Sequence, residues 1–202
     1  MSNETQKQEY EFTKNWFDWS PPIWTQLIPL LPERKNFLEI GSFEGRSTVW
    51  TAENMMEDGG EIVCIDTWEG GMEHVHGEMV GAEGRFDKNM ALLKEKFPER
   101  GVNKQKGLST TWLPTLRHEN CTFDFIYIDG SHVAKDVITD ACMSWPMLKI
   151  SGFMVFDDYL WKPQGLTAMD RPKIAIDAFT NMFENELEVV HVGYQLVVRK
   201  IK

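Results

Sequence analysis

The sequence predicts an α/β protein with a Rossmann-like, doubly wound sheet of seven mostly parallel strands. Strand and helix patterns alternate along the chain, which is typical of this class. The strands that begin near residues 37, 61, 123 and 152 are continuous apolar runs, as expected when helices cover both faces of a sheet. The last two strands, 187–192 and 195–200, are separated only by Gly193 and Tyr194. Because so short a link allows no helical crossover, the sheet is expected to end in an antiparallel hairpin.

The remaining elements follow in order from the apolar periodicity. We expect strands at 37–41, 61–66, 103–107, 123–129 and 152–157, and helices at 46–57, 84–97, 110–118, 133–149 and 172–185. Pro146 should kink the helix over 133–149. The long loops 67–83 and 158–170 follow strands, and loops of this length often act as lids over a site.

The domain organisation is simple. Residues 1–12 are polar and are expected to form a flexible N-terminus, and residues 13–202 to form a single domain. Within that domain, residues 13–36 are rich in aromatic side chains and predict a helical lead-in that caps the core, interrupted by Pro21 and Pro22.

Charge and cysteine content limit the partners. The formal net charge of -10 disfavours nucleic acid and anionic membranes, because both require a basic surface. There is no apolar run long enough to span a membrane and no N-terminal targeting pattern. The three cysteines do not form a closed disulfide set, which indicates a reducing compartment. We therefore expect a cytoplasmic protein that acts on a small molecule, either alone or as a homo-oligomer.

A glycine turn between the first strand and its helix predicts nucleoside binding. Glu39, Gly41, Ser42 and Gly45 lie in this turn, and Asp66 ends the next strand roughly 20 residues further on, where an acid binds ribose hydroxyls. The alternative interpretation is an ordinary strand, loop and helix with a glycine cap.

The side chains of the turn also indicate which nucleoside is bound. Phe43 stands where a dinucleotide fold has its second glycine, and Glu44 lies beside it, so an anionic pyrophosphate would meet a bulky ring and a like charge. S-adenosylmethionine has no phosphate, and its sulfonium and ammonium groups suit Glu39 and Glu44. Arg46 argues the other way.

Four motifs carry a resemblance to a known family. They begin at Phe37, Ile65, Phe123 and Gly152 and read FLEIGSFEGRSTVW, IDTWEG, FDFIYIDGSH and GFMVFDDYLW. In order and spacing they resemble the class I S-adenosylmethionine-dependent methyltransferases. The chain is most similar to the methyltransferase domain type 24 family, and more distantly to macrolide sugar and catechol O-methyltransferases. The similarity runs from about Trp16 to the last residue, and it implies methyl transfer to a small hydroxylated molecule.

The cofactor is expected at the carboxyl ends of the strands, where open α/β sheets bind their ligands. Glu39 and Gly41 would face the methionine half, Asp66 the ribose, and Trp68 with Ser109 the adenine. The full set of candidate cofactor residues is Glu39, Gly41, Ser42, Gly45, Asp66, Thr67, Trp68, Ser109 and Asp129.

Three acids at the ends of neighbouring strands predict a metal site. Asp129 ends one strand, and Asp157 and Asp158 end the next, so parallel pairing at roughly 5 Å would bring their carboxylates together. Mg²⁺ prefers such oxygen ligands. The arrangement resembles metal-dependent catechol O-methyltransferases, with Asp158 in place of an amide. Alternatively, Asp157 and Asp158 cap a loop and contact backbone amides or Lys162.

His132 is the candidate general base, with Asp129 as the second candidate catalytic residue. Methyl transfer to a hydroxyl requires removal of its proton, and an imidazole titrates near neutrality. In the resembling metal enzymes a lysine or an aspartate takes this place, and a structural hydrogen bond is the alternative role. Other activities left open are an S-adenosylmethionine lyase, a nicotinamide-dependent oxidoreductase and a noncatalytic cofactor-binding subunit.

Overall fold

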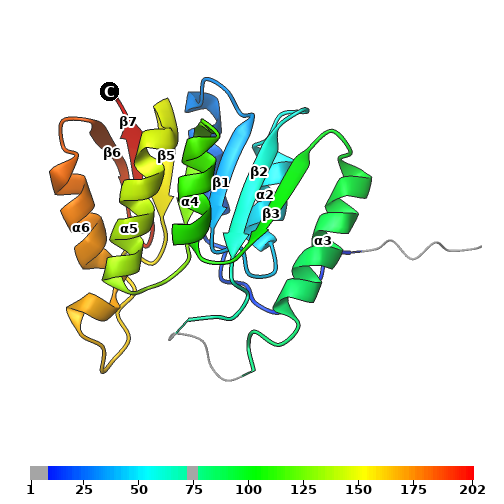
Figure 1. The fold of residues 1–202 in the computed structure, drawn as a ribbon, viewed down its shortest axis with the longest axis horizontal. Coiled ribbons are helices and arrows are strands. Elements are labelled where there is room, and N and C mark those ends of the chain that lie inside the picture. Colours follow the sequence, from blue (N-terminus) through cyan, green and yellow to red (C-terminus); the bar gives the residue numbers. More distant parts are fainter. Residues whose placement is uncertain (1–8, 72–76) are drawn as a thin grey trace, which may run out of the picture.

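The computed structural model of the protein describes residues 9–71 and 77–202 and shows one seven-stranded sheet flanked by helices (Figure 1). The strand order is β3-β2-β1-β4-β5-β7-β6. Strands β1 to β5 pair in parallel, and β7 pairs antiparallel with both β5 and β6. The predicted fold class is confirmed, including the antiparallel hairpin at the end of the sheet.

The strands lie close to their predicted positions. Their bounds are β1 Asn36–Ile40, β2 Glu61–Asp66, β3 Gly101–Lys106, β4 Phe123–Ile128, β5 Leu148–Phe156, β6 Leu187–Val192 and β7 Leu196–Lys200. Every residue of β4 is buried, because helices cover both faces of the centre of the sheet.

Two layers of helices enclose the sheet. The helices are α1 Pro21–Leu27, α2 Arg46–Asn54, α3 Ala82–Lys96, α4 Ser109–His118, α5 Ala134–Ser144 and α6 Pro172–Met182. Helices α4, α5 and α6 contribute apolar side chains to one core, and α1, α2 and α3 contribute to the core on the other face. Figure 1 shows α4 and α5 in front of the sheet and α2 behind it. No helix in the described part of the chain is long and apolar enough to cross a membrane.

Two prolines that we expected to interrupt helices lie outside helix interiors. The prediction of a kinked helix over 133–149 is wrong: α5 ends at Ser144, and Pro146 lies in a 3-10 turn, Trp145–Met147, that leads directly into β5. Pro21 is the first residue of α1, a position where its missing N–H costs nothing. The other two 3-10 turns are Ile28–Leu30 and Ala168–Asp170.

Residues 9–12, which we expected in the flexible N-terminus, lie against the helices. The Tyr10 hydroxyl donates to Glu53 of α2 at 2.8 Å, and the Glu11 amide donates to Asn89 of α3 at 2.8 Å. The chain then continues through residues 13–20 to α1, whose Trp24 is fully buried in the core.

Candidate active site

A cavity of about 800 Å³ opens at the carboxyl ends of the parallel strands. It brings together residues from the turn after β1 and from the loops after β2, β3, β4 and β5. The predicted site residues that line it are Gly41, Ser42, Asp66, Thr67, Ser109, Asp129, His132, Asp157 and Asp158. Glu39, Gly45 and Trp68 are not among the lining residues.

Gly41 permits a close crossing of backbone at the floor of the cavity. Its φ is +89°, and a Cβ built on it would lie 2.0 Å from the carbonyl oxygen of Asp129. The Gly41 amide donates to the carbonyl of Ile65 at 2.8 Å, and the Asp129 amide donates to Ile40 at 2.8 Å. Only glycine fits here, because any side chain would force β1 and β4 apart at their carboxyl ends.

Asp66 ties the glycine turn to the end of β2. One carboxylate oxygen accepts hydrogen bonds from the amides of Ser42 and Phe43, both at 2.8 Å. The other oxygen accepts from the amide of Trp68 at 2.7 Å. Phe43 itself has a positive φ of 47°, a strained conformation for a bulky residue. The acid expected to bind ribose therefore also fixes the turn beside it.

Glu39 lies beneath the turn and away from the cavity. It is 1% exposed, and its carboxylate accepts hydrogen bonds from the hydroxyls of Ser42, Ser47 and Thr48. Burial raises the pKa of Glu39, and these hydroxyls oppose that rise. We expected Glu39 to face the methionine half of a cofactor, but its side chain does not line the cavity.

The carboxylate of Glu44 is also engaged within the protein. It is 1% exposed and accepts from Arg85 of α3 at 2.5 Å and from the amide of Thr13 at 2.6 Å. Glu44 thus joins the glycine turn to α3 and to the segment before α1.

Two of the predicted cofactor residues support the turn from outside the cavity. The Trp68 side chain is 6% exposed, packs on Phe86 with ring centroids 5.0 Å apart, and donates its indole N–H to the Phe43 carbonyl at 2.7 Å. Gly45 has a φ of +77° at the residue before α2, and a Cβ there would meet Met90. The structure does not bring the Trp68 ring to the adenine side of this cavity.

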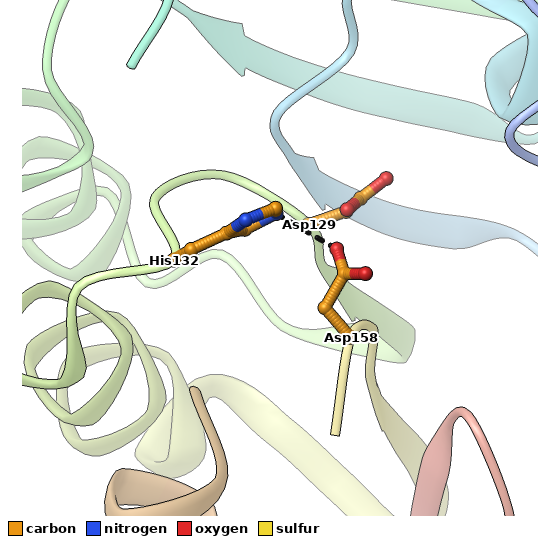
Figure 2. A group of neighbouring side chains, drawn as sticks. All are labelled: Asp129, His132 and Asp158. Carbon is orange, nitrogen blue, oxygen red and sulfur yellow. Dashed lines mark ion pairs between the residues drawn. The ribbon is translucent and has the colours of Figure 1, made fainter. Parts of the chain in front are cut away.

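Asp129, His132 and Asp158 converge at the ends of β4 and β5 (Figure 2). His132 Nε2 lies 2.8 Å from an oxygen of Asp158. One ligand atom from each of the three side chains lies within 4.8 Å of the other two, which is close enough for all three to contact one cation. The structure places His132 in this group, where the sequence predicted Asp157.

The side chain of Asp157 points into a buried hydrogen-bond network. Its carboxylate accepts from Gln195 at 3.0 Å, from the Asp158 amide at 2.7 Å and from the hydroxyl of Tyr127. The Tyr127 hydroxyl also lies 2.9 Å from Asp129. Sequence reasoning missed Tyr127 and Gln195, since a tyrosine in an apolar strand and a glutamine before the last strand give no signal of their own.

Burial and neighbouring carboxylates raise the pKa values of Asp129 and Asp157. Burial first, and then the neighbouring Asp157 and Asp158, hold the pKa of Asp129 well above its usual range. Burial and the Asp158 charge raise the pKa of Asp157 to about 6, although its donors oppose the rise. Three carboxyl groups therefore lie together at this end of the cavity, and Asp129 and Asp157 hold a proton more readily than a free aspartic acid does.

Aromatic side chains from three parts of the chain also line the cavity. Trp16 and Trp19 come from the segment before α1, Tyr194 comes from the β6–β7 turn, and Trp161 follows β5. The ring of Trp161 meets His132 edge-on at 4.4 Å, and Trp19 meets Tyr194 at 5.8 Å. The cavity thus offers flat apolar surfaces to a ligand, and the Trp161 ring lies beside the acidic group.

A sequence profile described as a methyltransferase domain, type 24, matches residues 38–159, which span the glycine turn, the cavity floor and all three converging side chains. The chain belongs to this methyltransferase family. An uncharacterised protein of Acanthamoeba polyphaga mimivirus is 28% identical over 145 residues, which cover 67% of this chain. The chain spans 58% of the length of that relative.

Solved structures share the fold of this family member. An O-methyltransferase from Bacillus cereus in complex with SAH superposes with a TM-score of 0.65 at 17% identity, over 96% of this chain and 84% of the other. TomG, an O-methyltransferase from Streptomyces achromogenes in complex with SAM, gives 0.65 at 18% identity, over 89% and 78%. MycE in complex with Mg, SAH and mycinamycin VI gives 0.61 at 16% identity, over 95% and 51%. The fold is that of class I methyltransferases.

Proposed function

We propose that this protein transfers the methyl group of S-adenosylmethionine to an oxygen atom of a small hydroxylated molecule. One observation carries the proposal: a single cavity joins the glycine turn and Asp66 at one end to Asp129, His132 and Asp158 at the other. A cofactor bound along β1 and β2 would direct its methyl group toward the acids after β4 and β5. Solved structures with this fold include O-methyltransferases in complex with SAM or SAH.

The contribution of the protein to such a reaction is alignment. Methyl transfer is an in-line displacement, so rate is gained by holding the acceptor oxygen, the methyl group and the sulfur in one line. The turn after β1 is rigid because Asp66 and Gly41 fix its backbone. The aromatic rings that line the cavity would offer apolar surfaces to a small acceptor.

His132 fits the role of general base. Its Nε2 lies 2.8 Å from Asp158, and a carboxylate at that distance orients an imidazole and stabilises the imidazolium formed when it accepts a proton. The ring is also held edge-on by Trp161. These contacts support a fixed base at the acceptor end of the cavity.

The same group of residues fits a divalent cation. Burial and then the neighbouring carboxylates raise the pKa values of Asp129 and Asp157, and hard cations such as Mg²⁺ prefer carboxylate oxygens. Asp129 and Asp158 would hold the ion, with His132 beside them. A bound cation would lower the pKa of an acceptor hydroxyl. MycE, a structure of the same fold, is described in complex with Mg.

Binding and turnover experiments test the proposal. Calorimetry should show S-adenosylmethionine binding to the purified protein, and incubation with hydroxylated acceptors should yield methylated product by mass spectrometry. Binding of a nicotinamide dinucleotide instead would favour the oxidoreductase alternative, and cofactor cleavage without a methylated product would favour a lyase. Cofactor binding without either reaction over a broad acceptor panel would favour a noncatalytic subunit.

Chelation distinguishes a metal-dependent reaction from one in which His132 acts as the base without a metal. If a cation organises the acceptor, EDTA should abolish transfer while the affinity for S-adenosylmethionine stays nearly unchanged. If His132 acts without a metal, EDTA should have no effect, and His132→Ala should lower the maximal rate by roughly 10²-fold. Full activity of His132→Ala in EDTA would exclude both roles.

The cellular setting and partners are proposed on similar grounds. Cys64, Cys121 and Cys142 are free thiols, which supports a reducing compartment such as the cytoplasm. The net charge of -10 disfavours nucleic acid as the acceptor. A small molecule is the acceptor that the cavity favours.

A further inference from the structure

A part-buried hydrogen bond joins α4 to α5 at the β3 end of the cavity. Ser109, the first residue of α4, donates its hydroxyl to Asp140 of α5, with 2.5 Å between Oγ and Oδ1. The Asp140 side chain is 3% exposed, and both residues line the cavity. The mechanism proposed above does not use Asp140.

This bond determines what Ser109 can offer to a ligand. A serine hydroxyl has one hydrogen and two lone pairs. When Asp140 is ionised it can only accept, so the Ser109 hydrogen is directed to it and the Ser109 oxygen presents only lone pairs to the cavity. Ser109 is thereby fixed as a hydrogen-bond acceptor.

The position of this pair corresponds to the base of a bound nucleoside. Asp66 ends β2, and Ser109 follows β3, the next strand outward in the sheet. A nucleoside whose ribose lies at Asp66 and whose sulfur points toward Asp129 would extend its base toward Ser109. The group of the base that a hydrogen-bond acceptor selects is an exocyclic amine.

We propose that Asp140 is a positioning residue that orients the Ser109 hydroxyl, so that the cavity selects a 6-amino purine over a 6-oxo purine. The inference rests on the proposed function, since it assumes a nucleoside cofactor in the cavity. An amine donates to the Ser109 oxygen, whereas a carbonyl in the same place brings two acceptors together. A site built to make a hydrogen bond rejects an analogue that leaves a buried polar group unpaired.

The environment of Asp140 argues against a purely structural link between the two helices. Burial, and after it the charge of Asp136, raises the pKa of Asp140 to about 7, although the Ser109 hydroxyl opposes the rise. A carboxyl group in so buried a place destabilises the fold when it ionises. An apolar pair would join α4 and α5 without that penalty.

Two ligands that differ at position 6 of the purine test the inference. We would measure dissociation constants for S-adenosylhomocysteine and S-inosylhomocysteine by calorimetry at pH 8. The wild type should prefer the adenosyl ligand by about 10-fold or more. In Asp140→Ala the Ser109 hydroxyl is free to turn and donate, so this preference should fall to about 3-fold or less. Ser109→Ala should lose the preference in the same way.

A neighbouring acid supplies the matched control. Asp136 lies one turn earlier on α5, lines the same cavity, and accepts a hydrogen bond from Ser131 at 2.9 Å. Asp136→Asn should keep the wild-type preference. A merely structural role of Asp140 would weaken both ligands equally and leave their ratio unchanged.

Each outcome bears on a separate claim. An unchanged ratio in Asp140→Ala would overturn the inference, whatever Ser109→Ala shows, while the proposed function stands. Failure of the wild type to bind either ligand would instead overturn the proposed function, and the inference with it. If Asp140→Ala does not fold by circular dichroism, Asp140→Asn takes its place, because the Asn amide can donate to Ser109 and frees the Ser109 hydroxyl to turn, so the preference should also fall to about 3-fold or less.

Discussion

The two ends of the cavity satisfy their carboxylates in different ways. At the β1 and β2 end, Asp66 accepts three backbone amides and Glu39 accepts three hydroxyls. At the β4 and β5 end, Asp157 also has several donors, but Asp129 shares the Tyr127 hydroxyl with it, and burial and then the neighbouring carboxylates raise the pKa of each acid. The first end is a finished, rigid frame, whereas the second end gains from a positive charge or a proton supplied by a ligand. In the proposed reaction, the first end would hold the cofactor and the second would bind the acceptor.

The largest expected effect comes from removing an acid at the β4 and β5 end. Asp158→Ala deletes the partner of His132 and one candidate cation ligand, so methyl transfer should fall by about 10²- to 10³-fold. The affinity for S-adenosylmethionine should stay within a few-fold, since the frame at the other end is untouched. Steady-state rates together with calorimetry measure both, and an equal loss in binding and rate would show that the two ends are not separable.

A second test breaks the frame itself. Gly41→Ala places a Cβ 2.0 Å from the Asp129 carbonyl, so the free energy of unfolding should fall by about 3 kcal/mol or more as β1 and β4 separate. Gly84→Ala in α3 is the matched control, because a Cβ there meets nothing within 4 Å. That control should be neutral or stabilising by up to about 1 kcal/mol. Urea denaturation compares the two, and equal stability would contradict the close crossing.

Cofactor binding gives a third, smaller effect. Asp66→Ala removes an acceptor of three amides, and S-adenosylmethionine binding should weaken by about 1 to 3 kcal/mol while the fold persists. Calorimetry on the folded variant provides the measurement. Unchanged affinity would remove Asp66 from the cofactor site and leave it only the task of holding the turn.

The smallest effect concerns the pH dependence of stability. Because Asp140 has a folded-state pKa raised to about 7, the folded protein holds its proton more tightly than the unfolded chain. Its contribution to stability is therefore present at low pH and is lost as pH rises from about 4 to 7. Asp140→Asn should remove this loss. The difference in unfolding free energy between the variant and the wild type should therefore be about 1 to 2 kcal/mol more favourable to the variant at pH 8 than at pH 4. Parallel pH profiles of variant and wild type would show that Asp140 ionises normally.

The sequence predicted the strands and the acids at their ends, because apolar runs and strand-end polarity are local patterns. It did not predict which way side chains turn. Trp68 was expected at the adenine but packs on Phe86, since its indole finds a carbonyl partner in the glycine turn. The end of α5 was also missed, because Pro146 was read as a kink within a helix that in fact stops two residues earlier.

Contacts between residues far apart in the sequence were not predicted for a different reason. Tyr127 and Asp157 meet because β4 and β5 are neighbours, and that much follows from topology. The contribution of Gln195 depends on where the hairpin turn lies over α1, and no local pattern encodes this position. Likewise, the bond between Ser109 and Asp140 depends on the packing of α4 against α5.

Gln195 has a consequence for the order in which the protein matures. Its side chain accepts from Trp24, near the start of the domain, and donates to Ser20 and to Asp157. During synthesis, β1 to β5 leave the ribosome before Gln195 and β7, so β5 waits as an open edge that can pair with other chains. The acidic end of the cavity is also incomplete until then. Catalytic competence would therefore arrive late in biogenesis, with the closing of the hairpin, and nascent chains that stall before residue 195 would be prone to aggregate and inactive.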